Sequence, residues 1–342
     1  MAATVFDFYL PSELNASHPP ERRGIRRDHV KMMVLDKKTG HVTHDQFFQL
    51  TDYLNPGDLV VMNNSRTVPA ILQAGVFRDT KIIQQEVEIR LARRLNEEIW
   101  DVLVVAEGVK LGDILCFSSD LTAVVIDTNA GTPLITILFS KKGTDLFNSI
   151  YSLGEPIRYE YISNNWGLDY YQTVFASHPG SVEMPSAGRA FSWELLFNLQ
   201  RKGIEIDFIQ LHTGLSYLLD DELETSPTDN YEEYHLSEKT IEKIRKTKAN
   251  GGRVIAVGTT VVRALESAGV TGALNGVTNL YINQSFPLKM VDGIITGFHE
   301  PKASHLDMLT SFVPQDLLWS AYKEAINQQY LWHEFGDMNL IL

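Results

Sequence analysis

The sequence predicts a mixed α/β fold in which both ends of the chain form one domain and a middle segment forms an inserted antiparallel β-barrel. Residues 152–342 alternate helix-like and strand-like segments, which is typical of a largely parallel sheet covered by helices. Residues 67–151 instead contain short β-branched runs separated by Gly, Asn and Asp, which is typical of a small barrel or sandwich. We therefore expect an α/β main domain at 1–66 and 152–342, interrupted by a β domain at 67–151.

The N-terminal segment contains short apolar runs broken by turns. Residues 34–35 and 59–62 read as strands, and the turn at residues 55–58 (Asn-Pro-Gly-Asp) directly precedes the second one. In the middle segment, residues 87–91 alternate between apolar and polar side chains, as expected for a half-buried strand. Four further strands are predicted there, at residues 100–105, 114–117, 121–126 and 134–139.

Two serines mark helix starts in the C-terminal segment. Ser192 precedes a helical stretch at 193–202, and Ser237 precedes one at 238–249. A serine hydroxyl in this position accepts a hydrogen bond from the first turn of a helix. Strands are predicted between and after these helices at residues 204–211 and 253–257, and a last helix is predicted at 315–329.

Composition limits the classes of function. The 342 residues are 44% hydrophobic and carry a net charge of −13, which argues against non-specific binding of polyanions. Cys116 is the single cysteine, so an internal disulfide or a cysteine-rich metal site is excluded. The N-terminus does not read as a signal peptide, and no apolar run is long enough for a transmembrane helix, so we expect a cytoplasmic protein without membrane contact.

A dense basic cluster lies in an early loop that contains Pro and Gly. It either contacts phosphate or is a solvated face, and it comprises Arg22, Arg23, Arg26, Arg27 and Lys31. Standard cofactor motifs are missing: there is no G-x-G-x-x-G after a strand and no P-loop, and His299 and His305 are too far apart for H-E-x-x-H. We expect no prosthetic group and no metal.

Five segments rich in small or polar residues each follow a predicted strand, where α/β folds place their ligands. They are residues 62–66, 184–189, 212–215, 257–266 and 297–304. In the fourth segment, Gly258, Thr259 and Thr260 open a helix whose N-terminus suits an anionic or polar ligand. Arg263 and Glu266, three positions apart, share one face of that helix.

Structural alternatives exist for each of these residues. Thr259 or Thr260 can be a helix cap, Arg263 and Glu266 can be a surface ion pair, and His212 and His299 can be satisfied structural histidines. From pattern alone, the chain is an α/β protein with a polar-ligand site of undefined chemistry.

In their order along the chain, several segments resemble the S-adenosylmethionine:tRNA ribosyltransferase-isomerase family of queuosine biosynthesis. Residues 252–267 nearly reproduce G-R-V-I-A-V-G-T-T-S-V-R-T-L-E-S, and residues 291–299 resemble V-D-G-L-x-T-N-F-H. The resemblance covers essentially the whole chain, is weakest in the predicted β insert, and also includes residues 6–11, 52–70 and 335–338.

This resemblance implies an α/β domain with an inserted β-barrel. It also implies transfer of the ribosyl part of S-adenosylmethionine to 7-aminomethyl-7-deazaguanine in a tRNA anticodon, with rearrangement to epoxyqueuosine and release of adenine and methionine. S-adenosylmethionine would be the ribosyl-donor substrate and the tRNA anticodon the partner. The sequence does not indicate an oligomeric state. Such chemistry needs general acid–base groups in a water-poor pocket and a positive rim for the anticodon.

The implied catalytic group is Glu266, His212, His299 and Arg263. Arg263 would bind a substrate anion or orient Glu266, and Glu266 or a histidine would move protons. The implied substrate-binding residues are Asn64, Arg66, Pro185, Ala187, Gly188, Gly214, Gly258, Thr259, Thr260, Lys302 and Ser304.

Departures from the family pattern cluster in the same segments. Ala190 stands where the pattern has His, Asn64 where it has Asp, and His305 where it has Leu. An arginine of the pattern is missing from residues 212–220, and both histidines are missing from residues 227–234. These losses leave two alternatives open: a non-catalytic RNA- or nucleoside-binding paralogue, and an enzyme that uses S-adenosylmethionine on another acceptor.

Overall fold

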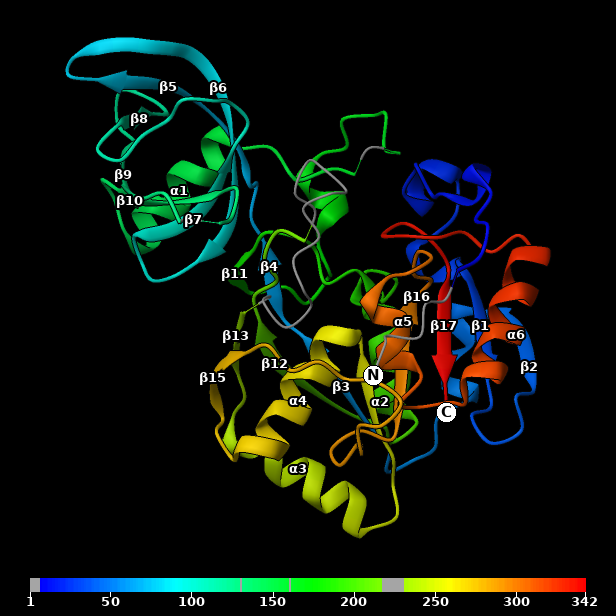
Figure 1. The fold of residues 1–342 in the computed structure, drawn as a ribbon. Helices are drawn as coiled ribbons and strands as arrows, with labels where there is room; N and C mark the ends of the chain where they lie inside the picture. Colours follow the sequence, from blue (N-terminus) through cyan, green and yellow to red (C-terminus); the bar gives the residue numbers. More distant parts are fainter. Residues whose placement is uncertain (1–6, 130, 160, 217–230) are drawn as a thin grey trace.

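A nine-stranded mixed sheet and a closed six-stranded barrel form the body of the molecule (Figure 1). They are seen in a computed structural model that describes residues 7–129, 131–159, 161–216 and 231–342. The predicted fold class is therefore confirmed. The exact boundaries between the two domains stay a prediction.

The core of the sheet is parallel and most of its flanks are antiparallel. Strands β12, β3, β14 and β16 are neighbours and run in the same direction. Antiparallel pairs join β15 to β13, β13 to β12, β16 to β17 and β1 to β2, whereas β17 and β1 are parallel. The expectation of a largely parallel sheet thus holds only for the centre. In spatial order the strands are β15 (Asn275–Thr278), β13 (Glu232–His235), β12 (Glu205–Leu211), β3 (Leu59–Asn63), β14 (Val254–Val257), β16 (Gly293–Gly297), β17 (Met338–Ile341), β1 (Lys31–Leu35) and β2 (Val42–Gln46).

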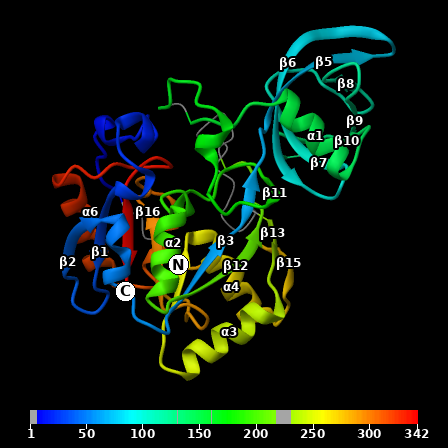
Figure 2. The ribbon, with the colours of Figure 1, turned by 180° about the vertical axis from the view of Figure 1, so that it is seen from behind.

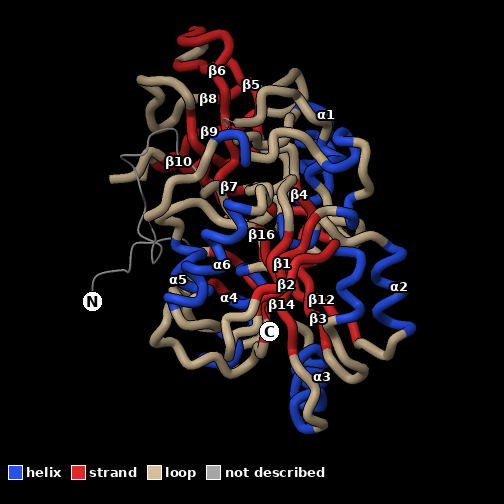
Figure 3. Tube along the Cα trace, turned by 90° about the vertical axis from the view of Figure 1, so that its right-hand side faces the viewer, coloured by secondary structure: helices blue, strands red, loops and turns tan. Residues whose placement is uncertain are grey.

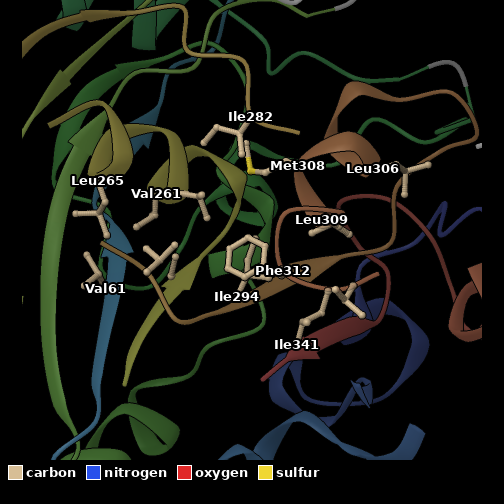
Figure 4. Packing of buried hydrophobic residues seen from close by; sticks show 14 of the residues in the cluster. Val61, Val261, Leu265, Ile282, Ile294, Leu306, Met308, Leu309, Phe312 and Ile341 are labelled. Carbon is tan, nitrogen blue, oxygen red and sulfur yellow. The ribbon is translucent and has the colours of Figure 1, made fainter. Parts of the chain in front are cut away.

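Helices cover both faces of this sheet, as the views from behind and from the side show (Figures 2 and 3). Side chains alternate between the faces along each strand, so Val61 joins one apolar cluster and Val60 the other. Figure 4 shows the first cluster, in which Val61 of β3 packs near Leu265 and Ile294. One face holds α3 (Glu238–Ala249), α4 (Thr259–Thr271), α5 (Ser304–Leu309) and α6 (Gln315–Asn327), and the other holds α2 (Trp193–Arg201).

The predicted helix caps are confirmed. The hydroxyl of Ser192 accepts a hydrogen bond from the backbone N–H of Leu195 at 3.1 Å, and that of Ser237 accepts one from Thr240 at 3.0 Å. These bonds satisfy donors in the first turn that have no partner within the helix. The start of both helices could therefore be predicted from local chemistry.

The barrel has an apolar interior and a helix that the sequence prediction missed. That helix, α1 (Gly143–Leu153), places Leu146 and Ile150 in the cluster that fills the barrel. Phe147 and Tyr151 also pack against this cluster, so apolar side chains recur at helical spacing and the sequence prediction overlooked a period that was present. The barrel strands are β5 (Ile71–Arg78), β6 (Lys81–Arg94), β7 (Ile99–Val104), β8 (Ile114–Cys116), β9 (Thr122–Asp127) and β10 (Leu134–Phe139).

The chain enters and leaves the barrel at one place. Ile71 and Glu155 exchange two backbone hydrogen bonds of 2.9 Å, so the incoming and outgoing segments lie side by side. Nearby, the guanidinium of Arg66 lies 5.1 Å from the ring centroid of Tyr151 in α1. The barrel is thus an insertion whose two ends are tied together.

Asn63 joins the ends of the two strands that lead toward the barrel. Its side-chain amide donates to the carbonyl of Leu211 at 2.8 Å, and its oxygen accepts from the N–H groups of Leu211 and Ser65, both at 3.1 Å. Beyond Asn63 the chain continues into β4 (Ser65–Thr67), which pairs with β11 (His178–Ser181) outside the main sheet. The buried amide therefore fixes the point at which the chain leaves the sheet.

Replacing Asn63 by Ala should lower the free energy of unfolding by about 2–4 kcal/mol, because three buried backbone groups lose their partner. Chemical denaturation of both proteins measures the difference. Gln200→Ala, on the exposed side of α2, is a matched control that should change stability by less than about 0.5 kcal/mol. An equal effect of both substitutions would contradict the role given to Asn63.

Candidate functional site

Four of the five predicted site loops leave the sheet at one edge. They follow β3, β12, β14 and β16, which are parallel neighbours, so their carboxyl ends lie together. The remaining loop reaches the same edge, because a Cβ added to Gly258 would lie 3.3 Å from that of Ala187. Gly258 occupies the cap position of α4 with φ of 92°, so neither Thr259 nor Thr260 is the helix cap.

His299 and His305 form a stacked pair beyond the end of β16. Their rings are nearly parallel, at an angle of 5° with centroids 4.7 Å apart. The Nε2 atom of His299 is hydrogen-bonded to the hydroxyl of Thr296 at 2.9 Å, and its Nδ1 atom makes no hydrogen bond to any described residue. Burial, followed by the nearby His305 and His333, lowers the pKa of His299 well below its usual value. His299 is thus a neutral imidazole with one nitrogen available.

Arg263 forms an ion pair with Glu232 of β13. The carboxylate of Glu232 is only 5% exposed and also accepts a hydrogen bond from the backbone of Gly214. Burial raises the pKa of Glu232, whereas the charge of Arg263 opposes that rise. The pair joins α4 to the loop that follows β12. Sequence reasoning missed Glu232, although it matches the glutamate of the family pattern H-x-M-H-S-E-x-Y.

Glu266 lies further along α4, about 4.5 Å along the helix axis from Arg263. Its carboxylate is fully buried and accepts hydrogen bonds from the backbone N–H groups of residues 289–291, at 2.8 to 3.2 Å. The sequence prediction placed Arg263 beside Glu266, but among the described residues the carboxylate that pairs with Arg263 is that of Glu232. Arg263 and Glu266 share one helix face, but their side chains do not meet. Glu266 instead anchors the loop at residues 289–291.

His212 is held by hydrogen bonds on both ring nitrogens. Its Nδ1 lies 2.7 Å from the hydroxyl of Ser65, which lies 2.6 Å from the hydroxyl of Ser181, and its Nε2 lies 2.6 Å from the amide of Gln210. Burial lowers the pKa of His212 to about 4. A Cβ at Gly180 would lie 2.7 Å from this ring, so the position of the ring depends on a glycine. His212 is therefore enclosed and has no free ring nitrogen.

Several predicted substrate-binding residues lie in buried backbone segments at the carboxyl edge of the sheet. Pro185 precedes a 3-10 helix at Ser186–Gly188, in which Ala187 and Gly188 are buried. The backbone of Gly214 packs against barrel strand β6, since its neighbour Leu215 donates to the carbonyl of Ala92 at 2.9 Å. These residues shape the site through the backbone.

Other predicted substrate-binding residues carry polar side chains. The side-chain oxygen of Asn64 is buried and makes no hydrogen bond to a described residue. Arg66 is exposed, Thr260 is half-buried, and Ser304 opens α5. Lys302 points away to an exposed pair with Asp7 at 3.7 Å. The structure therefore brings most of the predicted loops together but does not direct Lys302 into the cluster.

A second column of rings was not predicted. His333 stacks on Tyr161 at 4.2 Å, and Tyr161 stacks on Tyr159 at 5.8 Å. The hydroxyls of these tyrosines donate to Glu334 at 2.6 Å and to Glu183 at 3.0 Å. Burial raises the pKa of Glu334 to about 8, which the bond from Tyr161 opposes and nearby Glu183 reinforces. No sequence motif marks this column, because its rings come from two segments that lie more than 170 residues apart.

The comparisons with known proteins cover the whole chain. A family model described as Queuosine biosynthesis protein matches residues 3–341. The chain belongs to this family. It is 37% identical to the S-adenosylmethionine:tRNA ribosyltransferase-isomerase of Thermotoga petrophila, over 100% of both chains, and 37% identical to that of Carboxydothermus hydrogenoformans, over 98% of both. A crystal structure of the S-adenosylmethionine tRNA ribosyltransferase of Thermotoga maritima matches with 31% identity and a TM-score of 0.56, covering 98% of this chain and 99% of that one.

Two departures from the queuosine family pattern lie in the buried loop before α2. Ala190, which replaces a histidine, is 5% exposed, and the adjacent Arg189 is 1% exposed. Arg189 donates to Glu21 at 2.8 Å, and its guanidinium lies 5.1 Å from the ring of Phe335. An ion pair between buried Arg189 and half-buried Glu21 therefore joins this loop to the N-terminal segment. The departures at residues 217–220 and 227–230 lie outside the described residues.

Most of the early basic cluster has partners within this queuosine family member. Arg27 pairs with Glu21, Arg26 with Asp28 and Glu194, and Arg23 donates to the carbonyl of Phe335. Arg22 is exposed beside the rings of Trp166 and Tyr170. The part of the chain that the structure describes holds no cluster of metal-ligating residues and no helix able to cross a membrane.

Stability should depend on pH through Glu334. Because folding raises its pKa from an ordinary 4.5 to about 8, the unfolded state loses its proton first, and the free energy of unfolding falls between about pH 4.5 and pH 8. Glu334→Gln should remove about 2–4 kcal/mol of this fall. Denaturation at pH 5 and pH 8.5 measures it.

The matched control for Glu334→Gln is Glu242→Gln, at an exposed position of α3. It should leave the pH dependence as in the wild type. A Glu334→Gln protein that loses as much stability between pH 5 and pH 8.5 as the wild type would contradict a buried, largely protonated Glu334.

Proposed function

We propose that this protein is a cytoplasmic S-adenosylmethionine:tRNA ribosyltransferase-isomerase. The observation that carries the proposal is that family motifs far apart in sequence meet at the carboxyl edge of β12, β3, β14 and β16, in a chain similar to such enzymes over its full length. The reaction moves the ribosyl part of S-adenosylmethionine to 7-aminomethyl-7-deazaguanine in a tRNA anticodon and rearranges it, giving epoxyqueuosine. Adenine and methionine leave.

Within this reaction we assign proton transfer to His299. Its Nδ1 atom is unbonded within the described protein, and its low pKa keeps it unprotonated at neutral pH, as a general base requires. The bond from Thr296 and the stacked His305 hold the ring in place. His212 and Glu266 are assigned to positioning, because protein groups occupy their nitrogens and oxygens.

Charge complementarity supports a cationic substrate. The sulfonium of S-adenosylmethionine and the aminomethyl group of the acceptor are both positive. The column of His333, Tyr161 and Tyr159 carries Glu334 and Glu183 at its edge, and a bound cation would lower the raised pKa of both carboxyl groups and ionise them. Aromatic faces and carboxylates attract such cations most strongly where water is scarce. Exposed Arg22, beside two aromatic rings, is the member of the basic cluster that best suits the anticodon backbone.

Adenine should be released from S-adenosylmethionine only when tRNA carrying the deazaguanine precursor is present, with a matching gain in the mass of the tRNA. Chromatography of the nucleobase and mass spectrometry of the tRNA measure both. Folded protein that releases no adenine under either condition would overturn the proposal and favour a binding-only paralogue. Release without precursor-bearing tRNA would indicate another acceptor.

His299→Gln should lower the rate of adenine release about 10²–10⁴-fold, because the amide cannot accept a proton as the imidazole does. Binding of S-adenosylhomocysteine, measured by calorimetry, should change less than about threefold. His235→Gln, at an exposed histidine of β13, is the matched control and should keep the wild-type rate. A near-wild-type rate for His299→Gln would place proton transfer on another group.

A further inference from the structure

The stacked pair of histidines has one covered ring and one open ring. The inner ring, His299, is fixed by Thr296, and its backbone carbonyl accepts a hydrogen bond from Trp332 at 3.0 Å. The outer ring, His305, is exposed and makes no hydrogen bond to a described residue. Because His299 covers one face of His305, a planar ligand can stack only on the opposite face of the outer imidazole. Figure 4 shows α5, which carries His305, beside α4.

The surroundings of His305 keep its ring neutral. Surrounding protein, followed by the charge of Arg263, lowers its pKa to about 4. Arg263 comes from α4 and is paired with Glu232 of β13, and Asp307 on α5 itself is bound to the hydroxyl of Tyr281. At neutral pH the ring is therefore a flat, uncharged π surface.

We propose that the outer face of His305 is a stacking platform for a purine-type base. The base is either the adenine of S-adenosylmethionine or the deazaguanine of the tRNA, and this assignment rests on the function proposed above. A flat aromatic ring that is open on one side and rigidly backed on the other binds bases of either kind by stacking. Metal binding fits less well, because the ring nitrogens of two parallel stacked imidazoles do not converge on one point.

Sequence supports a role particular to this protein. The family pattern has Leu where this chain has His305, so the ring is an addition to that pattern. His305→Leu therefore removes the ring while restoring the residue of the family pattern, and His305→Phe keeps a ring without the nitrogens.

Two affinities test the platform: that of S-adenosylhomocysteine by calorimetry, and that of a precursor-bearing anticodon stem-loop by fluorescence anisotropy. His305→Leu should weaken one of them about ten- to a hundredfold, and His305→Phe should stay within about threefold of the wild type. A loss for S-adenosylhomocysteine assigns the platform to adenine, and a loss for the stem-loop assigns it to deazaguanine. His235→Leu, at an exposed and unstacked histidine, is the control.

Wild-type affinity of folded His305→Leu for both ligands would overturn the platform. If the wild-type protein still releases adenine in the presence of precursor tRNA, the proposed function stands even though the stacking platform is rejected. A wild-type protein that binds neither ligand would overturn both proposals. An equal loss in His305→Phe and His305→Leu would also reject stacking, because the ring would then not be the feature that matters.

Discussion

The amide of Asn63 holds β3 and β12 together at the point where both strands end. Everything beyond that point departs from the sheet: Ser65 and β4 on one side, His212 and Gly214 on the other. Ser65 then binds His212, and Leu215 binds barrel strand β6. The geometry of this corner of the site and the attachment of the barrel thus follow from one buried side chain with three hydrogen bonds.

Low polarity decides the protonation states around the site. Burial lowers the pKa of the histidines and raises that of the carboxylates, which moves both toward their neutral forms. In their neutral forms, Glu232 and Glu334 do not repel the nearby Glu183, although the protein as a whole carries a net charge of −13. A bound cation would lower the pKa of these carboxyl groups and favour their ionised forms.

Local chemistry could be predicted from the sequence, whereas contacts between distant segments could not. The caps at Ser192 and Ser237 and the strands β3 and β14 follow from nearest neighbours, and the alternation of helix-like and strand-like segments predicted the fold class. The pair of Arg263 and Glu232 depends on how β13 meets α4, which no spacing encodes. Glu266 was expected beside Arg263 for the same reason. A shared helix face does not show which residues of other elements pack against that face. The column of Tyr159, Tyr161 and His333 draws on loops that have no periodic pattern.

The sheet joins the first strand of the chain to the last. β1 pairs with β17, and Lys31 donates its N–H to the carboxylate of Asp337, 306 positions away. The barrel, by contrast, is formed by strands between residues 71 and 139. During synthesis the barrel can therefore fold as soon as its own strands emerge, while β1 and β2 wait as an unsupported hairpin until the ribosome has made β17. The sheet edge proposed as the site is therefore assembled only after the barrel, once β16 and β17 have been made.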